Sequence, residues 1–251
     1  MAVSKYGDGK VTDLSDWGRP IARMIAKKLI STPISVIQVT NLHLVLSLIC
    51  SWLIIQGQTI TACALLVVKG VIDAVDGELA RMREKPSHVG RYWDTVADTI
   101  GLIAVMCAFG SLFEWGPLLT TALILATLIQ YSLFNHYSII LRSRSSGDST
   151  SRMDETVKPT AYPWEKQSSV NFFHMIYLIF FSWQDRIIAF LAGKGSNSLT
   201  FELTVSSTLG FGLQSLIIMV MAITTQLIYL PELILGVNFV LMAVVLLRSH
   251  L

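Results

Sequence analysis

Charged residues are scarce in this chain of 251 residues. Asp, Glu, Lys and Arg together make up 14% of the sequence, whereas a soluble domain has about a quarter. Hydrophobic residues make up 53%, and they form repeated apolar runs long enough to cross the hydrocarbon layer of a bilayer. The composition therefore excludes an ordinary soluble domain. The net charge of +2 says little, because the location of the charges matters more than their sum. We expect membrane lipids, and no nucleic acid, as partners.

Cysteine is also rare. Cys50, Cys63 and Cys107 each lie inside an apolar run without metal-ligand spacing, so we expect three small buried apolar residues. A cleavable signal peptide is not expected, because the first 15 residues are polar.

The apolar runs predict six membrane spans, at about residues 38–57, 59–82, 89–112, 117–141, 205–228 and 231–248. A seventh run, 170–192, is interrupted by His174, Gln184, Asp185 and Arg186. With six spans, the Lys and Arg residues of the short loops all fall on one side, and that side is normally cytoplasmic. We therefore expect 170–192 to be an interfacial or re-entrant helix. Both termini should be cytoplasmic, in the cell membrane (the inner membrane) if the protein is bacterial.

Residues 14–30 precede the first span and have the pattern of an amphipathic helix. Apolar residues recur at helical spacing, and Arg19, Arg23 and Lys27 follow one another at i, i+4. The pattern predicts a helix in the membrane interface, or a solvated helix packed on the protein, and Pro33 should end it. The predicted fold is an all-α polytopic membrane helix bundle of two parts. Residues 1–35 form an N-terminal arm, and 36–251 form a six-span catalytic domain that includes a cytoplasmic loop and interfacial segment at 142–200.

Four aspartates interrupt the second and third apolar runs. Asp73 and Asp76 are spaced i, i+3, and Asp94 and Asp98 are spaced i, i+4, so each pair lies on one helix face. The connection between the runs is short, which predicts an antiparallel hairpin whose acidic faces meet. Crowded carboxylates repel one another in a poorly solvated place, and a divalent cation relieves the repulsion. Oxygen ligands favour Mg²⁺ or Mn²⁺ over zinc, and we expect two ions.

Small and basic residues accompany these aspartates. Gly77, Ala80 and Gly90 make room either for a bulky ligand or for close helix packing. Arg81 is placed to bind a phosphate or to pair with an aspartate, and Lys69 is either a second cation at the site or a snorkelling side chain. Salt bridges to Lys69, Arg81 and other nearby cations are the structural alternative for the aspartates. We favour a metal site, because ionisable residues within membrane segments usually have a function.

This stretch resembles the signature of the CDP-alcohol phosphotransferase family, D-x2-D-G-x2-A-R-x8-G-x3-D-x3-D. All eight fixed positions are present, at Asp73, Asp76, Gly77, Ala80, Arg81, Gly90, Asp94 and Asp98. The resemblance implies that Asp73, Asp76 and Asp94 hold the metal ions, and that Asp98 completes the site and acts as general base. It also implies contacts from Gly77, Ala80, Arg81 and Gly90 to a CDP moiety.

The family transfers a substituted phosphate from a CDP-linked donor to an alcohol and releases CMP, usually as a homodimer. The resemblance therefore implies one lipid substrate, with CDP-diacylglycerol as the expected donor. Members often begin the first span with a TPNxxT-like sequence. This chain departs from it but retains Gln38 and Thr40, which we expect to contact the CDP moiety. A looser likeness favours inositol or another polyol phosphate as acceptor.

Other polar residues have weaker signals. Arg142 and Arg144 end the fourth span and are candidates to bind an acceptor phosphate, although basic residues there are also ordinary topology signals. His136 and His174 are expected to be packed polar residues, and Asp185 is expected to pair with Arg186.

Two alternative functions fit the same aspartates. An intramembrane prenyltransferase also binds diphosphates through Mg²⁺, but a second acidic motif in a later span is missing. A cation transporter would need polar residues along several spans, whereas these acids cluster at one depth.

Overall fold

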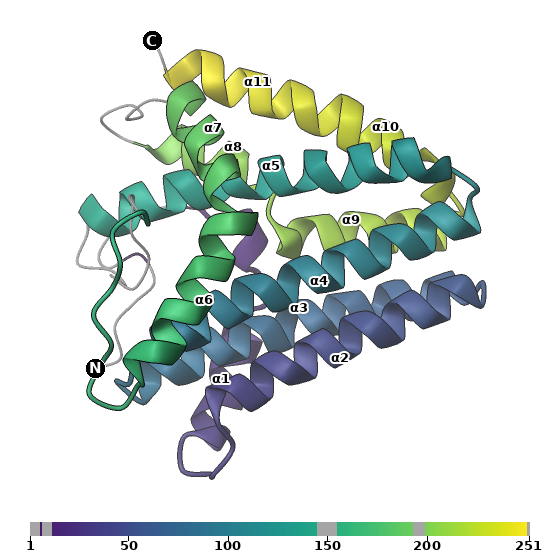
Figure 1. The fold of residues 1–251 in the computed structure, drawn as a ribbon. Helices are drawn as coiled ribbons and strands as arrows, with labels where there is room; N and C mark the ends of the chain where they lie inside the picture. Colours follow the sequence, from purple (N-terminus) through teal and green to yellow (C-terminus); the bar gives the residue numbers. More distant parts are fainter. Residues whose placement is uncertain (1–5, 7–11, 145–154, 193–198, 250–251) are drawn as a thin grey trace.

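The computed structural model describes residues 6, 12–144, 155–192 and 199–249, so parts of the predicted 142–200 segment lie outside the described residues. Every regular element in these residues is helical, and they contain no strand. Four long helices follow one another in the first part of the bundle: α2 (Val36–Ile55), α3 (Thr59–Met82), α4 (His88–Leu112) and α5 (Gly116–Arg144). These run alongside one another, and both ends of the chain lie at one end of the bundle (Figure 1). The all-α bundle predicted from the sequence is confirmed.

The last two spans are interrupted helices. The first comprises α8 (Thr200–Ser207) and α9 (Phe211–Ile223), with a break at 208–210. The second comprises a 3₁₀ turn (Leu227–Tyr229), α10 (Leu230–Glu232), a π-helical segment (Leu233–Val237) and α11 (Asn238–Ser249). The sequence predicted two uninterrupted spans here, at 205–228 and 231–248.

A buried polar network accompanies these interruptions. Gln130 of α5 donates to the carbonyl of Ile234 in the π-helical segment (2.8 Å) and accepts from the Asn238 amide (3.1 Å). Gln214 of α9 donates to the carbonyl of Thr208 in the break (2.8 Å). Backbone groups that an interrupted helix leaves unpaired must find partners inside the protein when they lie in a membrane. These two glutamines supply such partners.

In the part of the chain that the structure describes, five helical segments are long and apolar enough to cross a membrane: α2, α4, α5, Thr200–Ile223 and Leu227–Ser249. A sixth is added if the bent pair α6 (Gln167–Phe180) and α7 (Ser182–Ala192) counts as one span. Helix α3 is absent from this set because it carries charges such as Lys69, Asp73 and Asp76. Its 24 residues nevertheless reach about 36 Å, and it packs between α2 and α9.

Helices α6 and α7 meet at an angle of 57°. Both cross the end of the bundle that holds the two termini, rather than running along its length (Figure 1). Such a bend occurs in a broken span or in a re-entrant loop. The interfacial or re-entrant helix expected at 170–192 stays a prediction, now with two helices in place of one.

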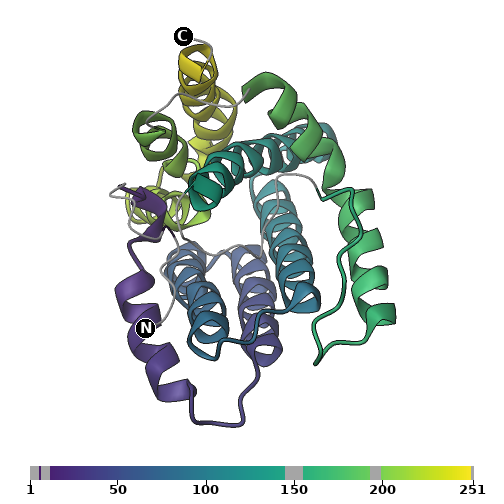
Figure 2. The same ribbon diagram turned by 90° about the vertical axis from the view of Figure 1, so that its left-hand side faces the viewer.

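The predicted N-terminal amphipathic helix is present as α1 (Arg19–Leu29). Its small side chains Ala22 and Ala26 are completely buried against α3, whereas Met24 is exposed. Seen from the end of the bundle that holds the termini, α1 and α6 lie on opposite sides (Figure 2). Arg19 and Arg23 turn toward Glu78 of α3, at 3.3 and 3.2 Å. Part of the basic face of α1 therefore forms ion pairs with α3.

The residues just before α1 are fixed to the start of α9. The Gly212 N–H donates to Ser15 Oγ, and the Trp17 indole donates to the Gly212 carbonyl, both at 2.9 Å. A Cβ at Gly212 would lie 1.8 Å from the Ser15 carbonyl oxygen. Only glycine leaves the backbones room to approach this closely.

Three minor predictions have mixed outcomes. Cys50 and Cys63 are buried, but Cys107 is exposed on the bundle surface, so its predicted burial was wrong. An apolar run contains lipid-facing as well as buried positions, and the run alone does not distinguish them. His174 is buried and lies 2.7 Å from the Glu155 carbonyl, and His136 is partly buried with its ring against Tyr137. Both fit the prediction of packed polar residues.

Candidate active site

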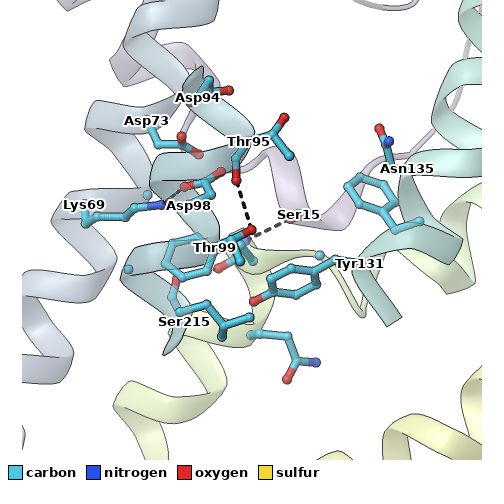
Figure 3. A pocket seen from close by; sticks show the side chains of 18 of the residues that line it. Ser15, Lys69, Asp73, Asp94, Thr95, Asp98, Thr99, Tyr131, Asn135 and Ser215 are labelled. Atoms are coloured by element: carbon cyan, nitrogen blue, oxygen red, sulfur yellow. Dashed lines mark hydrogen bonds and ion pairs between the residues drawn. The ribbon is translucent and has the colours of Figure 1, made fainter. Parts of the chain in front are cut away.

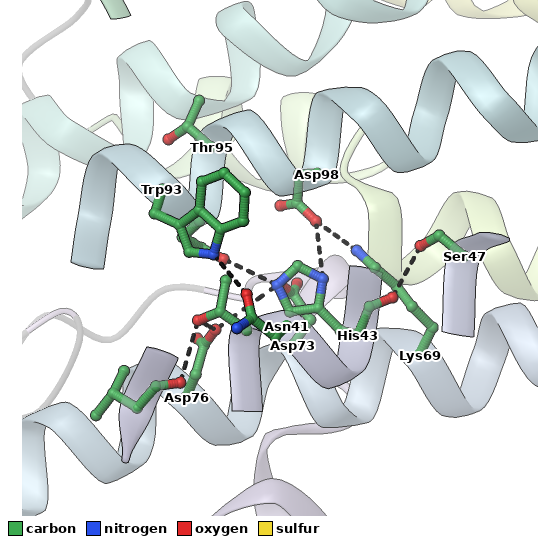
Figure 4. Close-up of polar contacts among 12 residues, drawn as sticks. Asn41, His43, Ser47, Lys69, Asp73, Asp76, Trp93, Thr95 and Asp98 are labelled. Carbon is green, nitrogen blue, oxygen red and sulfur yellow. Dashed lines mark hydrogen bonds and ion pairs between the residues drawn. The ribbon is translucent and has the colours of Figure 1, made fainter. Parts of the chain in front are cut away.

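The aspartates of α3 and α4 converge as the hairpin requires. The carboxylates of Asp73 and Asp76 of α3 and of Asp94 of α4 all lie close to the ring of His43 of α2. Each of the four offers a ligand atom, and these atoms all lie within 4.8 Å of one another. We call this group the carboxylate cluster (Figure 4).

The sequence interpretation missed His43. Its ring is completely buried, and its Nε2 lies 3.2 Å from Asp94 Oδ1 and 3.7 Å from both Asp73 and Asp76. A signal was available, because Thr40, His43 and Ser47 are spaced by three and four residues and so form a polar stripe on an otherwise apolar helix. That stripe faces the acidic side of the hairpin, as the contacts of Thr40 and His43 show.

The two residues predicted for the first span have different surroundings. Thr40 is buried and donates a hydrogen bond to Asp76 Oδ2 (2.7 Å). Gln38 is exposed and serves the start of α2, where it accepts from the Ser35 N–H (2.8 Å) in a capping box. Thr40 therefore supports the carboxylate cluster, and Gln38 has a visible structural role.

Asp98 lies beside the carboxylate cluster rather than in it. Its Oδ1 is 2.5 Å from the Lys69 ammonium and 3.8 Å from His43 Nδ1. The side chain remains 42% exposed, and its Oδ2 accepts no hydrogen bond from the described part of the chain. Lys69 is almost fully buried, with its ammonium 4.3 Å from the centre of the Phe211 ring. It is thus a cation of the site and does not snorkel to the surface.

The signature's glycines and arginine have separate positions. Arg81 donates to Glu78 (2.9 Å) and lines a cavity together with Gly77. Ala80 and Gly90 do not line this cavity. A Cβ at Gly90 would lie 3.1 Å from Ser87 Oγ, the atom that caps the start of α4. A glycine at position 90 is therefore also favoured by the close packing at the start of α4, apart from any contact with a ligand.

The start of α4 is fixed by the segment that follows α5. Glu165 accepts hydrogen bonds from Ser87 Oγ (2.7 Å) and from the Val89 N–H (2.9 Å). Arg91 forms a two-bond ion pair with Glu155, at 2.6 and 2.8 Å. A carboxylate at a helix start satisfies backbone N–H groups that lack helical partners. These contacts hold the helix that carries Asp94 and Asp98.

The cavity has a volume of about 450 Å³. Asp73 and Asp94 lie at one side, with Asp98 next to them, while Tyr131 and Asn135 of α5 lie on the opposite side (Figure 3). The segment before α1 and the start of α9 form another part of the wall, through Ser15 and Phe211. The cavity thus joins the carboxylate cluster to a second, less acidic half.

The carboxylate cluster fits a hard divalent cation. Two like charges about 4 Å apart repel by about 4 kcal/mol at an effective dielectric constant of about 20, and the cluster contains three carboxylates. His43 Nδ1 is buried without a hydrogen-bond partner in the described residues, so the chain leaves this centre incompletely satisfied. Carboxylates suit Mg²⁺ and Mn²⁺, and an imidazole nitrogen moves the preference toward transition metals.

The residues predicted to bind an acceptor phosphate do not line the cavity. Arg142 donates to the Ser138 carbonyl (3.2 Å), and Arg144 is exposed at the end of α5. The predicted pair between Asp185 and Arg186 was also wrong. Asp185 accepts from the Tyr177 hydroxyl (2.7 Å), while Arg186 donates to Ser182 Oγ (2.9 Å). Neighbours in a helix point in directions about 100° apart, so they do not face each other.

Comparison with known proteins agrees with this geometry. The family profile of CDP-alcohol phosphatidyltransferases matches residues 35–247. The chain belongs to this family. Its members transfer substituted phosphate groups, so the protein is a transferase, and they are generally metal-dependent. The match begins at α2 and leaves α1 and the segment before it outside. No curated protein matches the chain.

Membership accounts for the site better than either alternative. A CDP-linked donor and an alcohol acceptor are the substrates of the family, and a cavity with one strongly acidic half suits a diphosphate held through a cation. Neither a prenyltransferase nor a cation transporter explains the complete signature. The apolar helices and the family together identify an integral, multi-pass membrane protein.

Proposed function

We propose that the protein is a Mg²⁺-dependent phosphotransferase of phospholipid synthesis, which transfers the phosphatidyl group of CDP-diacylglycerol to an alcohol and releases CMP. One observation carries the proposal. Three aspartates and His43 converge at a cavity that Gly77 and Arg81 also line, and Asp98 stands beside them on the side of the open space.

Asp73, Asp76 and Asp94 would hold the metal ions, with His43 as a fourth ligand or as a neighbour that fixes their positions. Bound there, Mg²⁺ or Mn²⁺ would neutralise the diphosphate and the leaving CMP. Thr40 keeps Asp76 oriented through its hydrogen bond. Arg81, which borders the cavity beside Gly77, would bind the nucleotide phosphates, and the small side of Gly77 lets them approach the α3 backbone.

Asp98 would act as the general base. Its Oδ1 is held by Lys69, and its Oδ2 is available to a ligand in the cavity. The alcohol gives its proton to that oxygen while its own oxygen forms a bond to the β-phosphorus. The bond between this phosphorus and the CMP oxygen breaks, and the electron pair leaves with CMP. A positioned base of this kind contributes about 100-fold to 10,000-fold in rate.

The remaining details of the proposal follow the sequence and the resemblance. The bundle end that carries α1 also carries the connection between α3 and α4, with Arg83 and Lys85, which supports a cytoplasmic active site. A two-ion site, contacts from Ala80 and Gly90 to the CDP moiety, a homodimer, the division at residues 1–35 and 36–251, and a bacterial cell membrane stay predictions.

The proposed reaction is tested with purified protein, Mg²⁺ and two donor sets. One set combines CDP-diacylglycerol with a panel of small alcohols, and the other combines CDP-choline-type donors with diacylglycerol. We expect CMP release with the first set and its loss on Asp98→Asn. CMP release only with the second set would show that the lipid is the acceptor and that the CDP-linked substrate is the water-soluble one. No release with either set, or release unaffected by Asp98→Asn, would overturn the proposal.

A further inference from the structure

The half of the cavity between α5 and α7 differs from the carboxylate cluster in both shape and charge. We propose that this acceptor half binds the alcohol and selects one without a phosphate group, and that Asp185 recognises hydroxyl or ammonium hydrogens of this alcohol. The inference rests on the proposed function and names its acceptor class. It replaces the sequence-based expectation of a polyol phosphate.

The position of the acceptor half follows from Asp98. This residue lies between the carboxylate cluster and the part of the cavity bordered by Tyr131 and Asn135 (Figure 3). A nucleotide held at the carboxylate cluster fills the α3 side. The attacking hydroxyl must reach Asp98 from the other direction, so the rest of the alcohol lies toward α5 and α7.

The charges of the cavity are divided between the two halves. Among the described residues, the cations that line the cavity come from α1 and α3 only: Arg19, Lys69 and Arg81. Each is already paired with a carboxylate, because Arg19 and Arg81 contact Glu78 and Lys69 contacts Asp98. In the described residues, α5, α6 and α7 contribute no Lys, Arg or His to the lining.

Asp185 is the charged residue of the acceptor half. Its Oδ2 accepts from the Tyr177 hydroxyl, and the described part of the chain supplies no other hydrogen bond to this carboxylate and no cation within 4.0 Å. Arg91 also lies close to the Tyr177 ring, 5.8 Å from its centre, but its guanidinium is occupied by both oxygens of Glu155. Asp185 therefore presents to the cavity a carboxyl group that has no cationic partner in the described residues and has one oxygen available to a ligand.

Neutral hydrogen-bonding groups complete the lining. The Tyr131 hydroxyl and the Asn135 amide form no hydrogen bond within the described residues. Ser132 and Gln184 also line this half, and they bond to each other at 3.0 Å. A ligand with several hydroxyls, or with a hydroxyl and an ammonium, satisfies such groups.

A phosphate monoester is poorly matched to the same surface. It would bring about two negative charges close to Asp185 without a cation to receive them, and buried charges need a partner. The arginines that the sequence suggested for this purpose, Arg142 and Arg144, do not line the cavity, and neither does Arg186. The acceptor half thus disfavours a phosphate, because it offers no cation to pair with it, and favours an alcohol whose hydroxyl or ammonium groups donate hydrogen bonds.

The experiment compares matched acceptors with CDP-diacylglycerol and Mg²⁺, by CMP release. The pairs are glycerol with glycerol 3-phosphate, and inositol with an inositol monophosphate. Serine and ethanolamine test whether the group of the alcohol that forms a hydrogen bond to Asp185 is an ammonium rather than a hydroxyl. We expect at least about a tenfold higher kcat/KM for the acceptor without phosphate, which is the scale of one charge-assisted hydrogen bond. An equal or higher kcat/KM for the phosphate esters would overturn the inference.

Two variants test the residues. Asp185→Asn should raise the acceptor KM by about tenfold and leave the donor KM unchanged, which also shows that the protein is folded. Arg186→Gln is the matched control, because its side chain is exposed and lies outside the cavity. We expect it to change neither KM. If Asp185→Asn lowers the yield of folded protein, Asn135→Arg at an exposed position should shift the kcat/KM ratio toward the phosphate esters.

The outcomes separate the two proposals. No CMP release with any acceptor would overturn the proposed reaction and this inference together. CMP release with an unchanged acceptor KM in Asp185→Asn, or with no shift in the ratio for Asn135→Arg, would overturn the acceptor assignment and leave the proposed reaction standing.

Discussion

The two halves of the cavity are built in different ways. The carboxylate cluster comes mainly from one hairpin, α3 and α4, whose aspartates lie within 26 positions of each other in the sequence. The proposed acceptor half collects side chains from α5, α6 and α7, and the long segment between Arg144 and Gln167 separates α5 from the other two helices in the sequence. Chemistry shared by a family can lie on one rigid hairpin, whereas the acceptor half that we propose depends on side chains from three surrounding helices. Four variants test this division.

The largest effect is expected from Asp94→Asn. The change removes one of three converging carboxylates, and we expect CMP release to fall by at least about 1,000-fold because the metal loses a ligand and a charge. A Mg²⁺ titration of the rate is the measurement. Glu232→Gln also replaces a carboxylate with an amide, at an exposed position in α10, which lies at the end of the bundle away from α1, and this variant should retain full activity. An unchanged rate in Asp94→Asn would remove Asp94 from the cluster.

Gly212→Ala tests the wall that both halves share. A Cβ there would clash with the Ser15 backbone, so we expect a loss of about 3 kcal/mol in folding free energy and a drop of about 6 °C or more in Tm. Thermal unfolding in detergent measures it. Gly236→Ala is the matched control, because nothing lies within 4 Å of a Cβ at that position. Equal Tm values for the two variants would show that the contact between Ser15 and Gly212 does not stabilise the fold.

His43→Ala tests the fourth member of the carboxylate cluster. The ring touches three aspartates, and groups that hold metal ligands in place typically contribute about 10-fold to 100-fold to metal affinity. We expect the Mg²⁺ concentration for half-maximal rate to rise by that factor, while the acceptor KM stays the same. Ser51→Ala, a polar change farther along α2, is the control. A changed acceptor KM with unchanged Mg²⁺ dependence would assign His43 to the acceptor half instead.

The smallest effect is expected from Tyr131→Phe. The change deletes a hydroxyl that extends from α5 into the cavity, toward the side of Asp98, and a single neutral hydrogen bond is worth about 1 kcal/mol. The acceptor KM should rise by about fivefold, with no change in donor KM or Mg²⁺ dependence. Initial rates at varied acceptor and donor concentrations distinguish the three parameters. An effect on the donor KM alone would place Tyr131 on the nucleotide side.

Much of the fold follows from local patterns. The lengths of the apolar runs predicted α2, α4 and α5 to within a few residues, because a bilayer demands helices of a fixed length whatever their neighbours are. The breaks at 208–210 and at the π-helical segment were not predicted. They depend on Gln214 and Gln130, which replace missing helical hydrogen bonds from other positions in the chain.

The sequence by itself determined the helical bundle, the family and the four aspartates, since period and spacing within one hairpin fix which side chains share a helix face. Only the tertiary structure decided that His43 joins three of these aspartates and that Asp98 pairs with Lys69. It also separated Arg142 and Arg144 from the cavity and turned Asp185 toward it. Contacts between distant helices depend on how the helices are rotated and packed against one another. The spacing of residues within one helix does not determine that rotation.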